Sequence, residues 1–166
     1  TGPMYQRTLA SELTSAAAHF PVIFLTGPRQ SGKTTLARAC FPDFRYLSLE
    51  DLQNRAEAID DPHGFLRRLE GLPGVILDEA QHAPDLFSYI QQFVDERRSG
   101  PMVLTGSQNF LLSAKISQSL AGRTAVMELL PFSLAELMKR TALTPAGFEA
   151  GEVPTGGPPV SDPNAI

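Results

Sequence analysis

Five short apolar runs divide the chain, and each has the length and composition of a β-strand. The first run, 21–26, is continuously apolar, which is typical of a strand buried on both faces of a parallel sheet. Residues 44–50 alternate between apolar and polar positions, as a strand does when its two faces differ. Further runs at 74–79, 101–107 and 124–130 complete the set. The pattern therefore predicts five strands.

Helical periodicity fills the intervals between these runs. The apolar residues of 86–94 recur at helical spacing, and 51–71 reads as two short helices, the second capped by Asp61 with Pro62 at its first helical position. Four further helices are expected. One spans 5–19, one begins directly after the glycine-rich turn that ends at Gly32, one spans 110–122 with Gly122 as C-cap, and one begins at Ser133. The alternation of strand and helix predicts a parallel α/β sheet with helices on both faces.

The 166 residues suffice for one well-cored domain, which we expect to span residues 4–140. From Thr141 the composition changes, because nine of the last 26 residues are Gly or Pro and no helical or strand period continues. Such a composition indicates a linker, an extended arm or a disordered tail at 141–166. We expect this segment to begin a further C-terminal region.

Charge and cysteine content narrow the class of protein. The net charge is −4, which disfavours a nucleic-acid-binding protein, although a local basic patch would be compatible with it. Cys40 is the single cysteine, so an internal disulfide is excluded and a cytoplasmic protein is expected. The apolar runs are too short to span a membrane, and no charged-then-apolar leader opens the chain.

The segment "GPRQSGKT" at 27–34 has the spacing of a phosphate-binding loop. Gly27 and Gly32 allow backbone turns that side-chain-bearing residues avoid, and they let the backbone approach the phosphates. The loop N–H groups and the start of the next helix would hold the phosphate oxygens. Lys33 would neutralise the β- and γ-phosphates, and Thr34 would bind Mg²⁺. The predicted nucleotide-binding residues are Gly27, Pro28, Arg29, Gln30, Ser31, Gly32, Lys33, Thr34 and Thr35.

Two adjacent acids follow the third predicted strand. Asp78 at the strand end suits a carboxylate on Mg²⁺, and Glu79 suits a general base for an attacking water. The alternative is a pair of solvated acids at a helix start, where the helix dipole favours negative charge. The letters DEAQ at 78–81 also spell the box of a class of helicases. A kinase would not need the second acid, so the pair favours hydrolysis.

Two further residues are candidates for the same chemistry. Ser107 ends the fourth predicted strand and could sense the γ-phosphate, although turn chemistry explains Gly-Ser there almost equally well. Arg123 follows the next predicted helix and could stabilise transition-state charge, often across a subunit boundary. An arginine in an ordinary surface salt bridge is an equal alternative.

With these residues in view, the chain resembles the AAA-type ATPase core found in many bacteria and archaea. Four blocks in order carry the resemblance: "LTGPRQSGKTTLAR", "ILDEAQHAPDLF", "LTGSQNFLL" and "LAGRTAVMELLPFSLAEL". The resemblance implies a three-layer P-loop NTPase fold of the ASCE class with sheet order 5-1-4-3-2. It also implies ATP or ADP and Mg²⁺ as ligands, Lys33 and Thr34 at the nucleotide, Asp78 at the metal, Glu79 at the water, Ser107 as sensor and Arg123 as an arginine finger.

In that family the core is usually joined to a C-terminal domain of unknown function, and we expect 141–166 either to end an excised fragment or to begin that region. We therefore expect an ATP-hydrolysing module that drives a conformational change in an attached domain or a protein partner, and that could form a homo-oligomer. A nucleotide-dependent assembly or signalling switch with little turnover is the first alternative. A nucleic-acid motor is the second, disfavoured by the absence of a basic stripe and of a second ATPase lobe.

Overall fold

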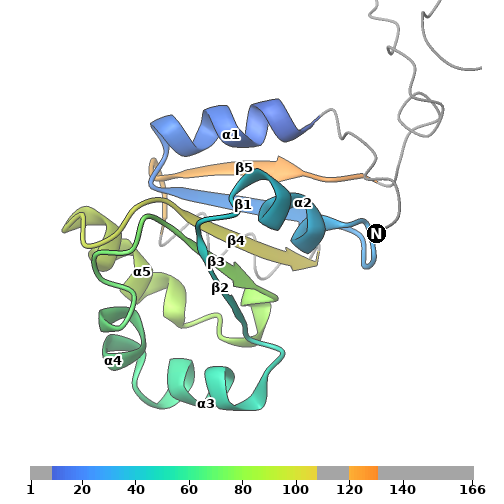
Figure 1. The fold of residues 1–166 in the computed structure, drawn as a ribbon. Helices are drawn as coiled ribbons and strands as arrows, with labels where there is room; N and C mark the ends of the chain where they lie inside the picture. Colours follow the sequence, from blue (N-terminus) through green and yellow to red (C-terminus); the bar gives the residue numbers. More distant parts are fainter. Residues whose placement is uncertain (1–8, 108–119, 131–166) are drawn as a thin grey trace, which may run out of the picture. The chain divides into compact units, whose positions relative to one another are not determined.

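A computed structural model describes residues 9–107 and 120–130 of the chain (Figure 1). The predicted helix from Ser133, the segment 141–166 and most of the predicted helix 110–122 lie outside these residues, as does the beginning of the predicted helix 5–19. The domain boundary near residue 140 therefore stays a prediction. The described residues belong to one compact unit.

Five parallel strands form one sheet, in the order β2-β3-β4-β1-β5. Their bounds are β1 Val22–Gly27, β2 Arg45–Ser48, β3 Val75–Asp78, β4 Met102–Ser107 and β5 Thr124–Glu128. Read from the other side, this is the order 5-1-4-3-2, so the fold class implied by the resemblance is confirmed. The strands β1, β3 and β4 are central and buried on both faces, which explains their apolar runs.

The helices cover both faces of the sheet, which gives three layers (Figure 1). Their bounds are α1 Leu9–His19, α2 Lys33–Cys40, α3 Leu52–Asp60, α4 Pro62–Arg67 and α5 Leu86–Asp95, and a 3-10 turn lies at Ala80–His82. Helices α1 and α2 pack on the face that presents Ile23, Ile76 and Val103. Helices α3, α4 and α5 pack on the opposite face.

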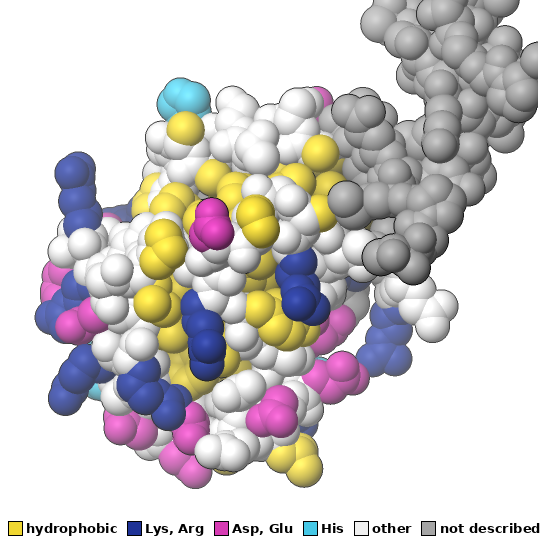
Figure 2. Space-filling model, viewed as in Figure 1, with side chains coloured by type: hydrophobic (Ala, Val, Ile, Leu, Met, Phe, Trp, Pro, Cys, Tyr) yellow, Lys and Arg dark blue, Asp and Glu magenta, His cyan; other side chains and the backbone are white. Residues whose placement is uncertain are grey.

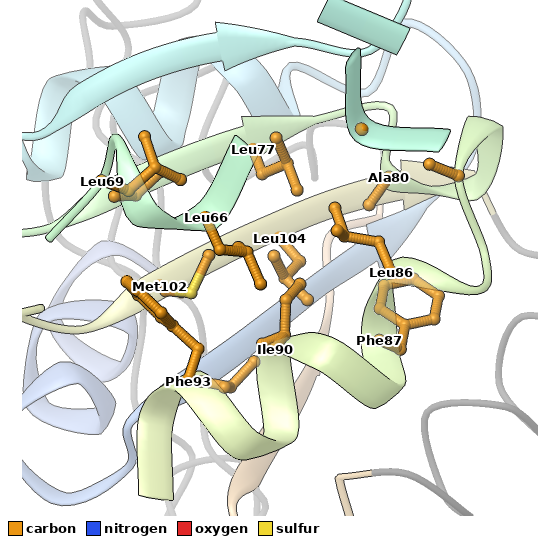
Figure 3. Close-up of a cluster of buried hydrophobic side chains, with 14 of the residues drawn as sticks. Leu66, Leu69, Leu77, Ala80, Leu86, Phe87, Ile90, Phe93, Met102 and Leu104 are labelled. Atoms are coloured by element: carbon orange, nitrogen blue, oxygen red, sulfur yellow. The ribbon is translucent and has the colours of Figure 1, made fainter. Parts of the chain in front are cut away.

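The larger core cluster lies on this second face (Figure 3). Leu86, Phe87, Ile90 and Phe93 of α5 point toward the strands and meet residues such as Leu104 of β4. These are the residues whose helical spacing is evident in the sequence. Burying each such side chain contributes about 1.5–3 kcal/mol to the free energy of unfolding.

The boundary between α3 and α4 follows the predicted capping chemistry. The Asp61 carboxylate accepts a hydrogen bond of 2.9 Å from the backbone N–H of Gly64, and Pro62 is the first residue of α4. Asp51 caps α3 in the same way by accepting from the N–H of Asn54 at 2.9 Å. Both caps satisfy N–H groups that a helix start leaves without a partner.

Within the described residues, no helix is long and apolar enough to cross a membrane. On the face seen in Figure 2, Lys and Arg side chains stand among Asp and Glu side chains rather than in a stripe of their own. This intermixing gives nucleic acid no continuous basic track on that face.

Candidate active site

The loop between β1 and α2 is built on two glycines with left-handed backbone. Gly27 has φ +148°, and a Cβ at this position would collide with the carbonyl oxygen of Leu129. The chain after β5 lies this close because the N–H of Leu129 donates to the Thr26 carbonyl at 2.7 Å. Gly32 has φ +90° and immediately precedes α2, which starts at Lys33. Both conformations favour glycine, so the spacing of the motif is imposed by the backbone.

Lys33 is buried inside its own loop, with 5 % of its surface exposed. Its Nζ donates to the carbonyl oxygens of Gly27 at 3.1 Å and Pro28 at 2.7 Å. Burial lowers the pKa of Lys33, whereas the negative charges of Glu79 and Asp78 raise it. The ammonium group is thus held beneath the loop, on the side of the two acids.

Asp78 ends β3 and is 7 % exposed. Three hydroxyl groups donate to its carboxylate, each from a different element. Thr34 of α2 donates to Oδ1 at 2.8 Å, Tyr46 of β2 donates to Oδ2 at 2.9 Å, and the Thr105 hydroxyl of β4 also donates to Oδ1. Burial, together with the hydrogen bond to Asp78, raises the pKa of the Tyr46 hydroxyl. A carboxylate surrounded in this way is oriented on both oxygens.

Glu79 has an uncommon backbone conformation for a residue with a side chain, φ 54° and ψ 45°. Its N–H donates to Thr105 Oγ1 at 3.3 Å, and its carboxylate accepts a hydrogen bond from the side-chain amide of Gln81. A left-handed non-glycine residue costs of order 1–3 kcal/mol and persists where its surroundings hold it, often at functional sites. Here the turn redirects the chain at the end of β3 and begins the 3-10 segment.

Ser107 ends β4 at the same edge of the sheet. It is the register partner of Gly27 in β1, as Asp78 is the register partner of Ser48 in β2. Because all strands are parallel, their carboxyl ends meet at one edge. The structure therefore brings Lys33, Thr34, Asp78, Glu79 and Ser107 to one region.

Arg123 lies at the opposite edge of the sheet. Its carbonyl accepts a hydrogen bond of 3.2 Å from the N–H of Val22, the first residue of β1. Its guanidinium makes a bidentate ion pair with Asp95 at the end of α5, at 2.5 and 2.9 Å. Within one chain, Arg123 is thus remote from the phosphate loop and engaged in the surface salt bridge that the sequence left as an alternative.

Three contacts at this site were not predicted from the sequence. They come from Tyr46, Gln81 and Thr105. Thr105 is a polar residue within an apolar run, which is a signal that could have drawn attention to it. For Tyr46 and Gln81 the local pattern carries no such signal, because their partners depend on strand order and on the turn at Glu79.

The five-stranded parallel sheet, with a glycine-rich loop between its first strand and α2, is the fold of a P-loop nucleoside-triphosphatase. Residues 19–138 match the AAA domain family. The chain therefore belongs to the AAA domain family, in agreement with the resemblance seen in its sequence.

Relatives and solved structures are consistent with this assignment. An uncharacterized protein of Mycobacterium tuberculosis is 38% identical over 128 residues, which is 75% of this chain and 28% of the relative. An uncharacterized protein of Methanocaldococcus jannaschii is 27% identical over 121 residues, 68% of this chain and 27% of that protein. The Walker-type ATPase of Pyrococcus abyssi shares the fold with TM-score 0.58 and 19% identity, covering 90% of this chain and 60% of that one. The chain spans little more than a quarter of the curated relatives' length.

Proposed function

We propose that this chain is a Mg²⁺-dependent ATP-hydrolysing module. The observation that carries the proposal is the 2.8 Å hydrogen bond between Thr34 Oγ1 and Asp78 Oδ1 at the mouth of the phosphate loop. It joins a hydroxyl at the start of α2 to a carboxylate at the end of β3, and these are hard oxygen donors of the kind that Mg²⁺ prefers. ATP as the nucleotide is supported by membership of the AAA domain family.

Each residue has a distinct role in this proposal. The loop N–H groups from Arg29 to Thr35 hold the phosphate oxygens, and Pro28, which has no N–H, shapes the turn. Lys33 exchanges its two carbonyl acceptors for phosphate oxygens, which carry more charge. Thr34 and Asp78 hold the metal, and a bound Mg²⁺ would neutralise charge on the phosphates.

Glu79 acts on the attacking water in this proposal. Its carboxylate accepts a proton from the water as the oxygen attacks the γ-phosphorus, and ADP leaves on the opposite side. Ser107, at the end of the neighbouring strand β4, is the proposed sensor of the γ-phosphate. The Asp78 carboxylate, proposed to bind Mg²⁺, is buried and held in one orientation by its neighbours. Glu79 is more exposed to solvent than Asp78.

Asp78→Asn tests the proposal directly. We expect the wild-type chain to release phosphate from ATP with Mg²⁺ and to stop when EDTA is added. Because the amide binds Mg²⁺ less well than a carboxylate, Asp78→Asn is expected to lower turnover and Mg²⁺ affinity by about 10- to 100-fold. Phosphate release titrated with Mg²⁺ gives both quantities.

The matched control is Asp60→Asn, which removes an exposed acid at the end of α3. It is expected to behave as the wild type. Hydrolysis that survives EDTA, or an Asp78→Asn protein as active as the control, would contradict the proposed metal site. ATP binding without turnover would instead favour the nucleotide-dependent switch.

We also propose that Arg123 acts as an arginine finger in a neighbouring copy of the chain, since it lies remote from the phosphate loop of its own chain. In that case turnover per molecule rises with protein concentration. Arg123→Ala is expected to lower turnover about 10-fold or more where the chain is partly assembled. Asp95→Asn breaks the same ion pair but keeps the guanidinium, so it is expected to remain near the wild type.

Phosphate release measured across a protein dilution series checks this prediction. Equal, small effects of Arg123→Ala and Asp95→Asn, together with turnover independent of concentration, would leave the salt bridge as the whole role of Arg123.

The module is proposed to act on an attached region or a protein partner. Support comes from the relatives, in which the matched part makes up 28% or less of the whole protein. Nucleotide-dependent changes would reach such a region through Lys33 and Ser107, which would contact the γ-phosphate, and through Glu79, which would hold the attacking water.

A further inference from the structure

Thr105 touches both acids of the site, although it lies on a different strand from either of them. It is fully buried in β4, which is the neighbour of β3 in the sheet. Its hydroxyl donates to Oδ1 of Asp78 and accepts the backbone N–H of Glu79 at 3.3 Å. In the described residues, no other side chain hydrogen-bonds to both Asp78 and Glu79.

The directions of these two hydrogen bonds are determined by chemistry. An ionised carboxylate only accepts and a backbone N–H only donates, so the single hydroxyl proton must point to Asp78 and a lone pair must face Glu79. The bond to Asp78 is buried and the bond to Glu79 is partly buried, so water cannot readily replace the hydroxyl at the carboxylate of Asp78. The Thr105 hydroxyl therefore ties the carboxylate of one acid to the main chain of the other.

The bond to Glu79 bears on its uncommon backbone conformation. Glu79 adopts φ 54°, a region that residues with a side chain rarely occupy, and its N–H needs an acceptor in that orientation. Thr105 supplies this acceptor. The turn is also supported by the His82 N–H, which donates to the Glu79 carbonyl at 3.1 Å, and by the Gln81 amide, which donates to the Glu79 carboxylate. Loss of the Thr105 hydroxyl would leave the Glu79 N–H without this acceptor, and we expect the turn and the Glu79 side chain to shift.

We propose that Thr105 is a positioning residue for hydrolysis. Its hydroxyl fixes the position of the proposed Mg²⁺-binding carboxylate, Asp78, relative to the proposed general base, Glu79. This inference rests on the proposed ATPase function. Thr34 would turn its hydroxyl to the metal in the loaded state, which leaves Thr105 as the donor to Oδ1 of Asp78. Tyr46 donates to the other oxygen of Asp78 and, among the described residues, does not hydrogen-bond to Glu79, so the two hydroxyls have separable effects.

The test compares Thr105→Val with Thr105→Ser. Valine keeps the volume and removes the hydroxyl, whereas serine keeps the hydroxyl. For Thr105→Val we expect kcat to fall about 10- to 100-fold at saturating ATP and Mg²⁺, with KM for ATP within about threefold of the wild type, because a displaced base slows the chemical step more than binding. Thr105→Ser is expected to recover most of kcat.

Two further variants separate positioning from packing. Tyr46→Phe removes a donor to Asp78 alone, so its effect is expected on the Mg²⁺ requirement and is relieved at high Mg²⁺, whereas the loss in Thr105→Val persists. Thr14→Val is the matched control, since the Thr14 hydroxyl bonds only to carbonyls of its own helix, at 3.1 and 2.9 Å, and its kcat is expected to equal the wild type.

An unchanged kcat in Thr105→Val, or a Thr105→Ser protein as slow as Thr105→Val, would overturn the inference while wild-type hydrolysis still supports the ATPase. A wild-type chain that binds ATP and never hydrolyses it would overturn the ATPase proposal itself. If thermal melting shows that Thr105→Val is unfolded, Thr105→Ala is measured against Thr105→Ser by the same criteria.

Discussion

Glu79→Gln is expected to abolish most ATP turnover while ATP binding is retained. The amide has nearly the shape of the carboxylate, and its oxygen can still accept the hydrogen bond from Gln81, so the turn after β3 should persist. An amide cannot take a proton from water, however, and loss of a general base lowers kcat by about 10²–10⁴-fold. Single-turnover phosphate release, beside equilibrium binding of a fluorescent ATP analogue, measures both quantities.

The control for this substitution is Glu12→Gln, an exposed acid on α1. It removes one negative charge without touching the site and is expected to match the wild type. Normal hydrolysis by the Glu79→Gln protein would remove Glu79 from the proposed mechanism. A loss of binding as large as the loss of turnover would instead show that the substitution disturbs the loop.

Lys33→Met is expected to weaken ATP binding by about 100- to 1,000-fold. Methionine keeps most of the buried aliphatic stem, but the Gly27 and Pro28 carbonyls lose their donor and the phosphates lose a buried positive charge. Removing one partner of a buried, hydrogen-bonded charge pair costs about 2–5 kcal/mol, and the expected 100- to 1,000-fold loss, about 2.7–4.1 kcal/mol, lies within that range. Isothermal titration with MgATP gives the dissociation constant.

Arg67→Ala serves as the control, because it removes an exposed cation on α4. It changes the net charge by the same amount and is expected to leave ATP affinity unaltered. Thermal melting without nucleotide shows whether Lys33→Met remains folded. ATP affinity in a folded Lys33→Met protein equal to that of the control would contradict phosphate binding by the loop.

Much of the fold follows from local pattern. Strands such as Val22–Gly27 and Val75–Asp78 are continuous apolar runs because both faces are covered, and the stripe on α5 is the face that meets the sheet. Asp61 and Pro62 mark a helix start through chemistry that acts within four residues. Periodicity and capping are short-range, so a sequence displays them directly. The order of the strands came only from the family resemblance.

For the site, the sequence by itself determined the groups that a contiguous motif contains: the phosphate loop with Lys33 and Thr34, and the adjacent acids Asp78 and Glu79. Their spacing along the chain is enough to identify them, because each motif lies at the end of a strand and is followed by a tight turn and the start of a helix. Their chemical roles remain predictions that the substitutions above decide.

Only the tertiary structure decided which hydroxyls surround the acids and where Arg123 lies. Tyr46 and Thr105 reach Asp78 because β2 and β4 flank β3 in a particular register, and a shift of one residue would turn either side chain to the opposite face. Arg123 falls at the far edge because β5 runs parallel to β1 and begins beside Val22. Strand order and register join residues distant in sequence, so no local pattern in the chain specifies them.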